Sequence, residues 1–306
     1  MAAYLSQRLV QAVVVIIGVT LVVFFLARLA PGDPVDLMLP EDALPEQREW
    51  LRHNLGFDRP LSMQYLIFMR NAVRGDLGNS LYYRKPCTGI ILEYLPNTLL
   101  LTVVSMFISI LFSVPAGIVA ALKRDSFFDY AGSFLALIGR SLPAYWLGLM
   151  LILVLSVELR LLPTSGIGKP QHLLMPAITL GAGLMGIIMR LTRSGLLDVL
   201  NEDYIRTARA KGIGGLLVIG RHALKNTLIP LVTVVGLQLG SLLAGSVIVE
   251  TVFSWPGVGR VLVMAIGARD YPLIQAGVLF VSVIFVFTNL AVDLTYAFID
   301  PRIRYQ

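Results

Sequence analysis

The chain has 306 residues, of which 56% are hydrophobic and only 14% are charged, and its formal net charge is +6. A soluble domain of this size carries nearer a quarter charged residues, so the composition excludes that class. The apolar residues gather in runs of about 20, the length that crosses a bilayer as a helix. We therefore interpret the basic excess as a sign of membrane orientation and contact with membrane lipid, and we expect no nucleic acid partner.

The cysteine and histidine content excludes two further kinds of site. Cys87 is the single cysteine, so no intramolecular disulfide can form. His53, His172 and His222 are far apart and show no metal-ligand spacing. We expect neither a metal nor any other cofactor.

The first apolar run, at about 9–29, predicts a transmembrane helix within residues 1–30. Cleavage as a signal peptide after Ala30 would place Arg28 at the −3 position, where a small residue is needed. We therefore expect the span to be retained. The Pro31 to Pro34 run that follows cannot continue a helix.

The longest polar segment, 31–96, is predicted to be extracytoplasmic and to contain one short helix. Asp58 can cap that helix, Pro60 suits its first turn, and Gly75 stops it. Its apolar face is predicted to hold Leu61, Tyr65, Phe68 and Ala72. Two hypotheses stay open, a helix packed on the membrane surface and a docking face for a soluble partner.

The third region, 97–306, predicts five more spans, at about 97–121, 131–160, 173–193, 230–252 and 272–297. The run at 131–160 is too long for one crossing. Its first part, with Arg140, is expected at the inner interface, with a bend at Pro143, and the next span is expected to begin near Pro176. The predicted fold class is all-α, a polytopic membrane protein with six transmembrane helices.

Loop charges predict that both termini are cytoplasmic. With that orientation the inner segments hold twelve Lys and Arg residues and the short outer loops hold four. The segment 31–96 holds seven more, but long loops cross the membrane largely regardless of charge. This orientation places the loop 194–229 in the cytoplasm.

Several short patterns argue against an enzyme. Gly181, Gly183 and Gly186 match a dinucleotide-binding pattern, but no strand precedes them, so helix packing is the favoured interpretation. Gly236, Gly240 and Ala244 likewise favour close helix contact, within the chain or between subunits. No phosphate-binding loop, nucleophile elbow or zinc-protease motif is present, so we expect no catalytic residues and no ATP site in this chain.

Polar residues are rare inside the predicted spans. An ionised carboxylate at mid-bilayer costs roughly 2.5–3.5 kcal/mol on insertion scales, so such groups should face protein or water. A turn rich in helix stoppers follows Glu250, and a short helix over Val258 to Ala268 is predicted after it. Candidate residues of the pathway or its outer mouth are Glu250, Phe253, Trp255, Pro256, Gly257, Asn289 and Asp293, although an interfacial position is an equal alternative for Glu250 and Asp293.

The most polar stretch between two spans, 201–230, predicts a short basic docking helix. Asn201 is a good N-cap, and Gly212 can take the left-handed position at the end. Ile205 and Ala208 fall on one side with Gly212, where small residues let another surface approach. The candidate docking residues are Asp203, Tyr204, Ile205, Arg206, Thr207, Ala208, Arg209, Ala210, Lys211 and Gly212. A solvated basic loop is the alternative.

This stretch resembles the cytoplasmic EAA loop of ATP-binding-cassette (ABC) importer permeases. The residues that carry the resemblance are Ala208, Gly212, Ile229 and Pro230. Arg206 and Thr207 replace the usual Glu-Ala, a departure that matches the dipeptide, oligopeptide and nickel branch. The resemblance extends to segments 31–34, 75–78, 95–99, 203–212, 222–226, 250–259, 269–272 and 300–303. Gly214 to Leu217 is less polar than in similar proteins, which bears only on the path of the loop.

The resemblance implies a type I ABC importer permease fold, with 97–306 as the core permease domain and 194–229 as its coupling loop. It implies a second, similar permease, two cytoplasmic ATPases and an extracytoplasmic substrate-binding protein as partners. Expected substrates are di- and oligopeptides, with glutathione, nickel or metal chelates as alternatives. An ion-coupled secondary transporter is a further alternative, but the charged relay pairs and internal repeat typical of that class are not evident.

Overall fold

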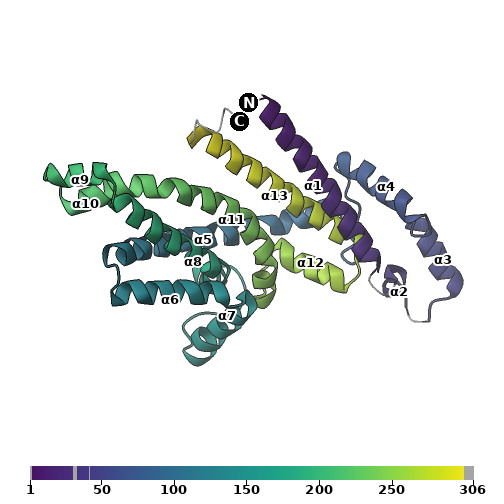
Figure 1. Ribbon diagram of the computed structural model, residues 1–306. Helices are drawn as coiled ribbons and strands as arrows, with labels where there is room; N and C mark the ends of the chain where they lie inside the picture. Colours follow the sequence, from purple (N-terminus) through teal and green to yellow (C-terminus); the bar gives the residue numbers. More distant parts are fainter. Residues whose placement is uncertain (1, 30–32, 41, 300–306) are drawn as a thin grey trace. The chain divides into compact units, whose positions relative to one another are not determined.

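The computed structural model of the protein describes residues 2–29, 33–40 and 42–299, and this part is helical apart from turns and one isolated bridge (Figure 1). The Pro31–Gly32 turn, the Asp300–Ile303 segment and the side chains of Ile229 and Asp293 lie outside the described residues. In chain order the elements are α1 (Ala2–Leu29), α2 (Pro34–Met38), α3 (Pro45–Asn54), α4 (Leu61–Val73), α5 (Cys87–Leu122), α6 (Phe127–Ser141), α7 (Ala144–Leu151), η1 (Ile152–Glu158), α8 (Pro170–Leu200), α9 (Asp203–Ala210), α10 (Gly215–Leu217), η2 (Val218–Ala223), α11 (Leu224–Val252), α12 (Val258–Gly267) and α13 (Tyr271–Ile299).

The apolar helices confirm the predicted all-α membrane fold. In the described ranges five helices are long and apolar enough to cross a membrane, and a sixth candidate is α6 with α7–η1, bent by 109°. The bend follows Ser141 and precedes Ala144, so the kink predicted at Pro143 is confirmed.

Several predicted helix ends are wrong because prolines were treated as boundaries. Pro176 and Pro230 lie inside α8 and α11, and α5 begins at Cys87 and therefore runs through Pro96. A proline removes only its own N–H bond, and packing in a membrane helix tolerates that loss.

The polar segment contains the predicted helix, α4, and two short helices, α2 and α3, that the sequence analysis missed. Asp58 does not cap α4. The N-cap position is Pro60, and the Asp58 carboxylate instead lies 2.6 Å from His53 Nδ1. That hydrogen bond lowers the pKa of Asp58 below its ordinary value. Gly75 follows the helix with φ of +82°, so the predicted stop is confirmed.

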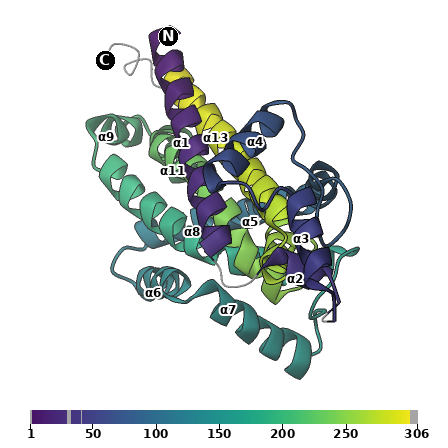
Figure 2. The same cartoon turned by 90° about the vertical axis from the view of Figure 1, so that its right-hand side faces the viewer.

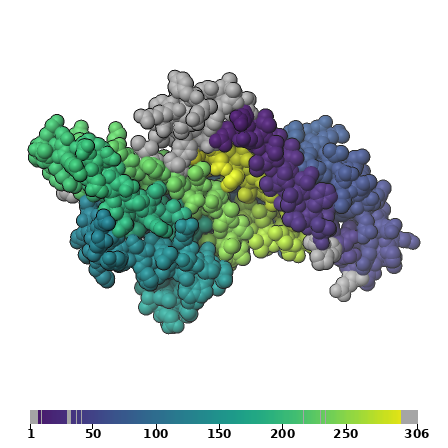
Figure 3. Space-filling view, in the orientation of Figure 1, coloured from purple at the N-terminus to yellow at the C-terminus, as the bar shows by residue number. Residues whose placement is uncertain are grey.

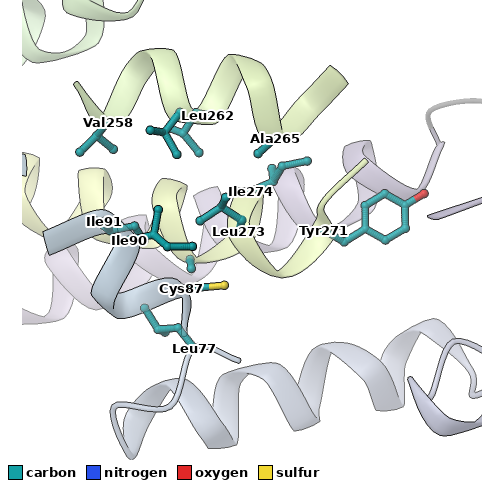
Figure 4. Close-up of a cluster of buried hydrophobic side chains, with 12 residues drawn as sticks. Leu77, Cys87, Ile90, Ile91, Val258, Leu262, Ala265, Tyr271, Leu273 and Ile274 are labelled. Carbon is teal, nitrogen blue, oxygen red and sulfur yellow. The ribbon is translucent and has the colours of Figure 1, made fainter. Parts of the chain in front are cut away.

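The chain divides into two compact units, residues 1–98 with 256–287 and residues 99–255 with 288–306. In the first unit, α1 lies beside the early part of α13 in both Figure 1 and Figure 2. Its apolar cluster joins the loop after α4, the start of α5, α12 and the start of α13 (Figure 4). The buried members are Leu77, Cys87, Ile90, Ile91, Val258, Val261, Leu262, Ala265, Tyr271, Leu273, Ile274 and Ala276.

Helix α4 packs on α1 in this unit through aromatic and polar contacts. The rings of Phe24 and Tyr65 meet edge to face at 5.2 Å between centroids. Arg28 donates from Nε and Nη2 to Gln64 Oε1 at 3.0 and 2.9 Å. Leu61 is exposed, so it does not share the packed face as predicted.

Asp270 connects the loop before α5 to the start of α13. The residue is fully buried, and its carboxylate accepts hydrogen bonds from Ser80 Oγ, from Tyr82 N at 3.1 Å and from Leu273 N at 3.2 Å. The bond from Leu273 makes Asp270 an N-cap of α13, where negative charge is favoured. One side chain therefore satisfies donors of two segments that are distant in sequence.

The second unit is built around α8, which packs against α6, α7 and α11. Glycines set the distance between these helices. A methyl group at Gly139 of α6 would lie 2.9 Å from the carbonyl oxygen of Ala182, and one at Gly117 of α5 would lie 2.7 Å from that of Met189. Gly181 and Gly186 of α8 leave no room for a side chain either, which confirms helix packing as their role, whereas Gly183 has open space around it and does not share that role.

We predict that Asp270→Ala destabilises the first unit. The substitution leaves the buried donors of Ser80 and Leu273, and the part-buried N–H of Tyr82, without their acceptor, so we expect a loss of about 1–3 kcal/mol in the free energy of unfolding. Thermal unfolding of the purified protein in mild detergent measures it. The exposed Asp42→Ala in the same unit is the control, with an expected change within about 0.5 kcal/mol. Equal midpoints for the two variants would contradict this role of Asp270.

Candidate functional site

The predicted docking helix is present as α9, at the end of the second unit where α8 and the η2–α11 segment meet (Figure 1). Its predicted N-cap is wrong. Asn201 ends α8, and its side chain donates from Nδ2 to Leu197 O at 3.0 Å. Glu202 is the extended N-cap residue of α9 and makes no side-chain cap bond. Because α8 continues to Leu200, Asn201 caps the C-terminal end of α8 and does not begin α9.

The end of α9 confirms the prediction for Gly212. Its φ is +76°, the left-handed region that favours glycine. The N–H of Ile213 donates to Ala208 O at 3.3 Å, and the N–H of Gly212 donates to Arg209 O at 3.0 Å. These two bonds form a Schellman end, which fixes the direction in which the chain leaves the helix.

The inner face of α9 packs on the chain itself. Ile205 is fully buried and Ala208 is 6% exposed, in a cluster with residues of α5, α8 and η2. The other buried members of this cluster are Ala121, Leu196, Val218 and Ala223. The expectation that Ala208 is presented to another protein is therefore wrong. Its small side chain is needed because α9 lies close against its own unit.

The outer face of α9 is polar and mostly basic. Asp203, Tyr204, Arg206, Thr207, Arg209, Ala210 and Lys211 are exposed, and Figure 3 shows this end of the unit at the molecular surface. Arg206 lies 3.4 Å from the Asp203 carboxylate within the helix. Tyr204 OH accepts a hydrogen bond from Asn226 Nδ2 at 2.7 Å. The contact from Asn226 orients the ring, while the guanidinium groups of Arg206 and Arg209 face solvent.

The proposed pathway residues near the end of α11 lie inside the chain. Glu250 is fully buried, and Phe253 and Trp255 are each 2% exposed. Ser254 has φ of +50°, and Trp255 N donates to Glu250 O at 2.8 Å, so the chain turns tightly after α11. Asn289 is half-buried in α13. None of Glu250, Phe253 and Trp255 forms an open surface in this structure.

The turn at Pro256 and Gly257 belongs to the first unit, where α5 holds it. Asn97 Nδ2 donates to Pro256 O at 2.8 Å, and Val258 N donates to Thr98 Oγ1 at 2.9 Å. The helix predicted after this turn is confirmed as α12. The polar residues 97 and 98 therefore explain why the turn and α12 are fixed beside the start of α5.

The sequence analysis missed two cavities in the second unit. The larger, of about 740 Å³, lies between α6 and α8 and contains Tyr130, Ser133, Arg140 and Arg190 in its wall. The smaller, of about 270 Å³, is lined from α6, α7, α8 and α11 and includes Arg140, Thr179, Gln238 and Ser241. Arg140 is common to both walls. Helical periodicity does not predict cavities, because they depend on how separate helices pack.

An ion pair beside the larger cavity joins α6 to α8. Arg193 donates from Nε to Asp129 Oδ1 at 2.5 Å and from Nη2 to Oδ2 at 2.6 Å, and Asp129 is nearly fully buried. This two-point geometry is the strong form of an arginine–carboxylate pair. Within the described ranges, no group of three or more His, Cys, Asp or Glu side chains lies together as a metal site would require.

Comparison with known families accounts for the whole chain. Residues 113–305 match the family described as "Binding-protein-dependent transport system inner membrane component", and residues 1–114 match the N-terminal region of such membrane components. Three curated relatives are similar over 100% of both chains. They are a dipeptide transport system permease of Alkalihalophilus pseudofirmus (45% identical), a glutathione transport system permease of Escherichia coli (44%) and a di/tripeptide transport system permease of Pseudomonas aeruginosa (42%).

Two solved structures share the fold at low sequence identity. The inward-facing MetNI methionine ABC transporter matches with a TM-score of 0.56 and 19% identity, over 70% of this chain and 97% of that one. An amino acid ABC transporter matches with a TM-score of 0.50 and 18% identity, over 68% and 93%. These likenesses confirm the predicted permease fold.

We predict that Ala208→Trp destabilises α9 from within. The larger side chain overfills the cluster around Leu196 and Val218, at an expected cost of about 1–3 kcal/mol. Faster cleavage of the 201–217 segment by a protease of broad specificity measures the loss. Thr207→Trp, on the exposed face next to it, is the matched control and should cleave at the wild-type rate. Equal cleavage of the two variants would contradict the inward orientation of Ala208.

Proposed function

The chain belongs to the family of binding-protein-dependent transport system inner membrane components and is a permease subunit of an ABC importer, and from this premise we propose that it carries di- and oligopeptides. The observation that carries the proposal is 45% and 42% identity, along the whole chain, to permeases named for dipeptides and di/tripeptides. The 44% identity to a glutathione permease supports glutathione as the second candidate.

Such a permease works with a cytoplasmic ATPase and a substrate-binding protein. We propose that the assembly contains a second permease and two ATPase subunits. The absence of a phosphate-binding loop in this chain agrees with ATP hydrolysis by partner subunits. The role of this chain is then to convert closure of the ATPases into alternating access of the pathway.

We propose that α9 is the element that contacts an ATPase. Its inner face is fixed to α5, α8 and η2 through the cluster around Ile205 and Ala208, so it moves with the ends of the spans. Its outer face offers Arg206 and Arg209 for acidic groups on the partner. Exposed ion pairs contribute about 0.2–1 kcal/mol each, so the shape of the helix and the ring of Tyr204 supply the rest of the contact.

We propose the orientation that the loop charges favour. Both termini and the coupling loop 194–229 are cytoplasmic, and the segment 31–96 is extracytoplasmic. The turn at Pro256 and Gly257, together with α12, then lies at the outer mouth, where the binding protein delivers substrate. Asn289 and Asp293 of α13 are proposed to face the pathway.

The substrate proposal is tested by ATP-driven uptake of a labelled dipeptide into proteoliposomes that contain the whole transporter and its binding protein. Excess unlabelled dipeptide should abolish uptake, and excess glutathione should reduce it less. Uptake that only glutathione inhibits, or that does not need ATP, would contradict the proposal.

We predict that reversing the charge on α9 weakens the binding of the ATPases to this chain. Arg206→Glu with Arg209→Glu removes two cations and adds two anions on the exposed face, so the loss in binding free energy should be about 1–3 kcal/mol, which is roughly 5- to 150-fold in ATPase affinity. Co-purification in mild detergent measures it. Arg160→Glu, an exposed arginine of an outer turn in the same unit, is the control and should retain the ATPases. Full retention by the double variant would contradict docking through this face.

The orientation predicts which side labels Leu217→Cys. Leu217 is 62% exposed in the coupling loop, whereas the native Cys87 is fully buried and should not react in the folded protein. An impermeant maleimide should therefore label inverted membrane vesicles and leave intact, outer-membrane-permeabilised cells unlabelled. Labelling of intact, outer-membrane-permeabilised cells would contradict the proposed orientation.

A further inference from the structure

Arg140 and Arg190 line the large cavity of the second unit without a carboxylate partner. Among the described residues, neither guanidinium has an ion pair or a side-chain hydrogen bond. The carboxylates in the wall are engaged elsewhere, since Asp129 binds Arg193 and Asp125 lies 3.4 Å from Arg124. The cavity therefore keeps two uncompensated positive charges.

The packing of α6 on α8 shows how these arginines are arranged. The two helices run antiparallel side by side, with Asp129 bonded to Arg193 near one end and Gly139 against Ala182 near the other (Figures 1 and 2). Arg140 is thus level with the region of Ala182, and Arg190 lies eight residues further along α8, about 12 Å at the rise of an α-helix. The two arginines therefore lie one after the other along the same wall of the cavity.

Arg140 lies in the walls of both cavities. It lines the 740 Å³ cavity together with Arg190 and the 270 Å³ cavity together with Gln238 and Ser241. With Phe127 at the cytoplasmic end of α6, in the orientation proposed above, Arg140 lies roughly 20 Å into the layer, and not at the inner interface where the sequence predicted it. A charged side chain at that depth is costly unless it faces protein, water or a counter-ion.

We propose that Arg140 and Arg190 form a two-step binding track for the carboxylate of the transported peptide. The proposal rests on the peptide substrate proposed above. A free peptide carries a terminal carboxylate, and arginine binds that group through paired hydrogen bonds. A guanidinium at Arg140 takes the carboxylate deep in the unit, and Arg190 takes it nearer the cytoplasmic end. Gln238 and Ser241 supply polar contacts at the deeper step.

The shared chemistry is an oxyanion bound by guanidinium groups, and both Arg140 and Arg190 are exposed on the wall of this open cavity. A phospholipid headgroup carries the same chemistry, and a carboxylate of the partner permease is a third source. Each of these occupants gives a different result in the experiment below.

The experiment compares Arg140→Gln and Arg190→Gln, singly and together, in the complete transporter in proteoliposomes at saturating loaded binding protein. We expect the double variant to lose about tenfold or more in maximal import, with co-purification of all subunits unchanged. Arg140→Lys with Arg190→Lys keeps both charges and should retain most of the import. Arg160→Gln removes the same charge from an exposed turn of the unit and is the matched control.

A second readout reports the anion site without transport. Ser133→Cys places a thiol on the cavity wall, and the native Cys87 is buried. An anionic thiosulfonate reagent should react with that thiol faster than a cationic one, and this preference should fall about tenfold when both arginines become glutamine. Excess free dipeptide should slow the anionic reagent in the wild-type transporter.

Each alternative has its own outcome. Normal import and an unchanged reagent preference in the double glutamine variant would overturn the proposal. An import defect that appears only in vesicles with anionic lipid would also overturn it and would assign the site to a lipid headgroup. Loss of the second permease on purification would overturn it as well and would assign the site to a subunit contact. If the wild-type transporter imports no peptide, the proposed peptide substrate is wrong. The reagent preference would still show whether the cavity binds anions.

Discussion

The close approach of α8 to its neighbours is the constraint on which the second unit depends. Gly181 and Gly186 of α8, with Gly117 of α5 and Gly139 of α6, bring backbone against backbone where any side chain would clash. In a lipid-facing protein this packing replaces the hydrophobic effect as the source of helix association. Because α9 follows α8 after two residues, the same contacts also determine where α9 lies.

Among the described residues, buried polar side-chain atoms have hydrogen-bond partners except Thr192 Oγ1 and Gln275 Nε2, as a medium without water favours. Ser105 and Ser109 are fully buried, and each donates its hydroxyl to the carbonyl four residues earlier, at 2.6 and 2.7 Å. Ser109 also donates to Gly181 O at 3.1 Å, so it contributes to the contact with α8. Arg140 and Arg190 are instead exposed on the cavity wall, and among the described residues neither guanidinium has an ion pair.

The first unit uses a different device, in which single side chains fix distant segments. Asp270 caps α13 and binds the loop that carries Ser80, while Asn97 and Thr98 hold the turn at Pro256 to Val258. The α9 region is held differently, because an apolar inner face packs on its own unit while a basic outer face is exposed.

The sequence by itself determined the all-α membrane fold class, the bend at Pro143, α12 and the left-handed Gly212, because each follows from local pattern and backbone sterics. Its resemblance to importer permeases was equally a property of local motifs. It could not assign Asn201 to the end of α8 or Pro176 to a helix interior, because both residue types are compatible with either position. Tertiary structure alone decided that Ala208 faces inward, that Asp129 meets Arg193 across 64 positions, and that Arg140 lies between two cavities. Those facts depend on which helix faces pack together, and periodicity within one helix does not specify its neighbours.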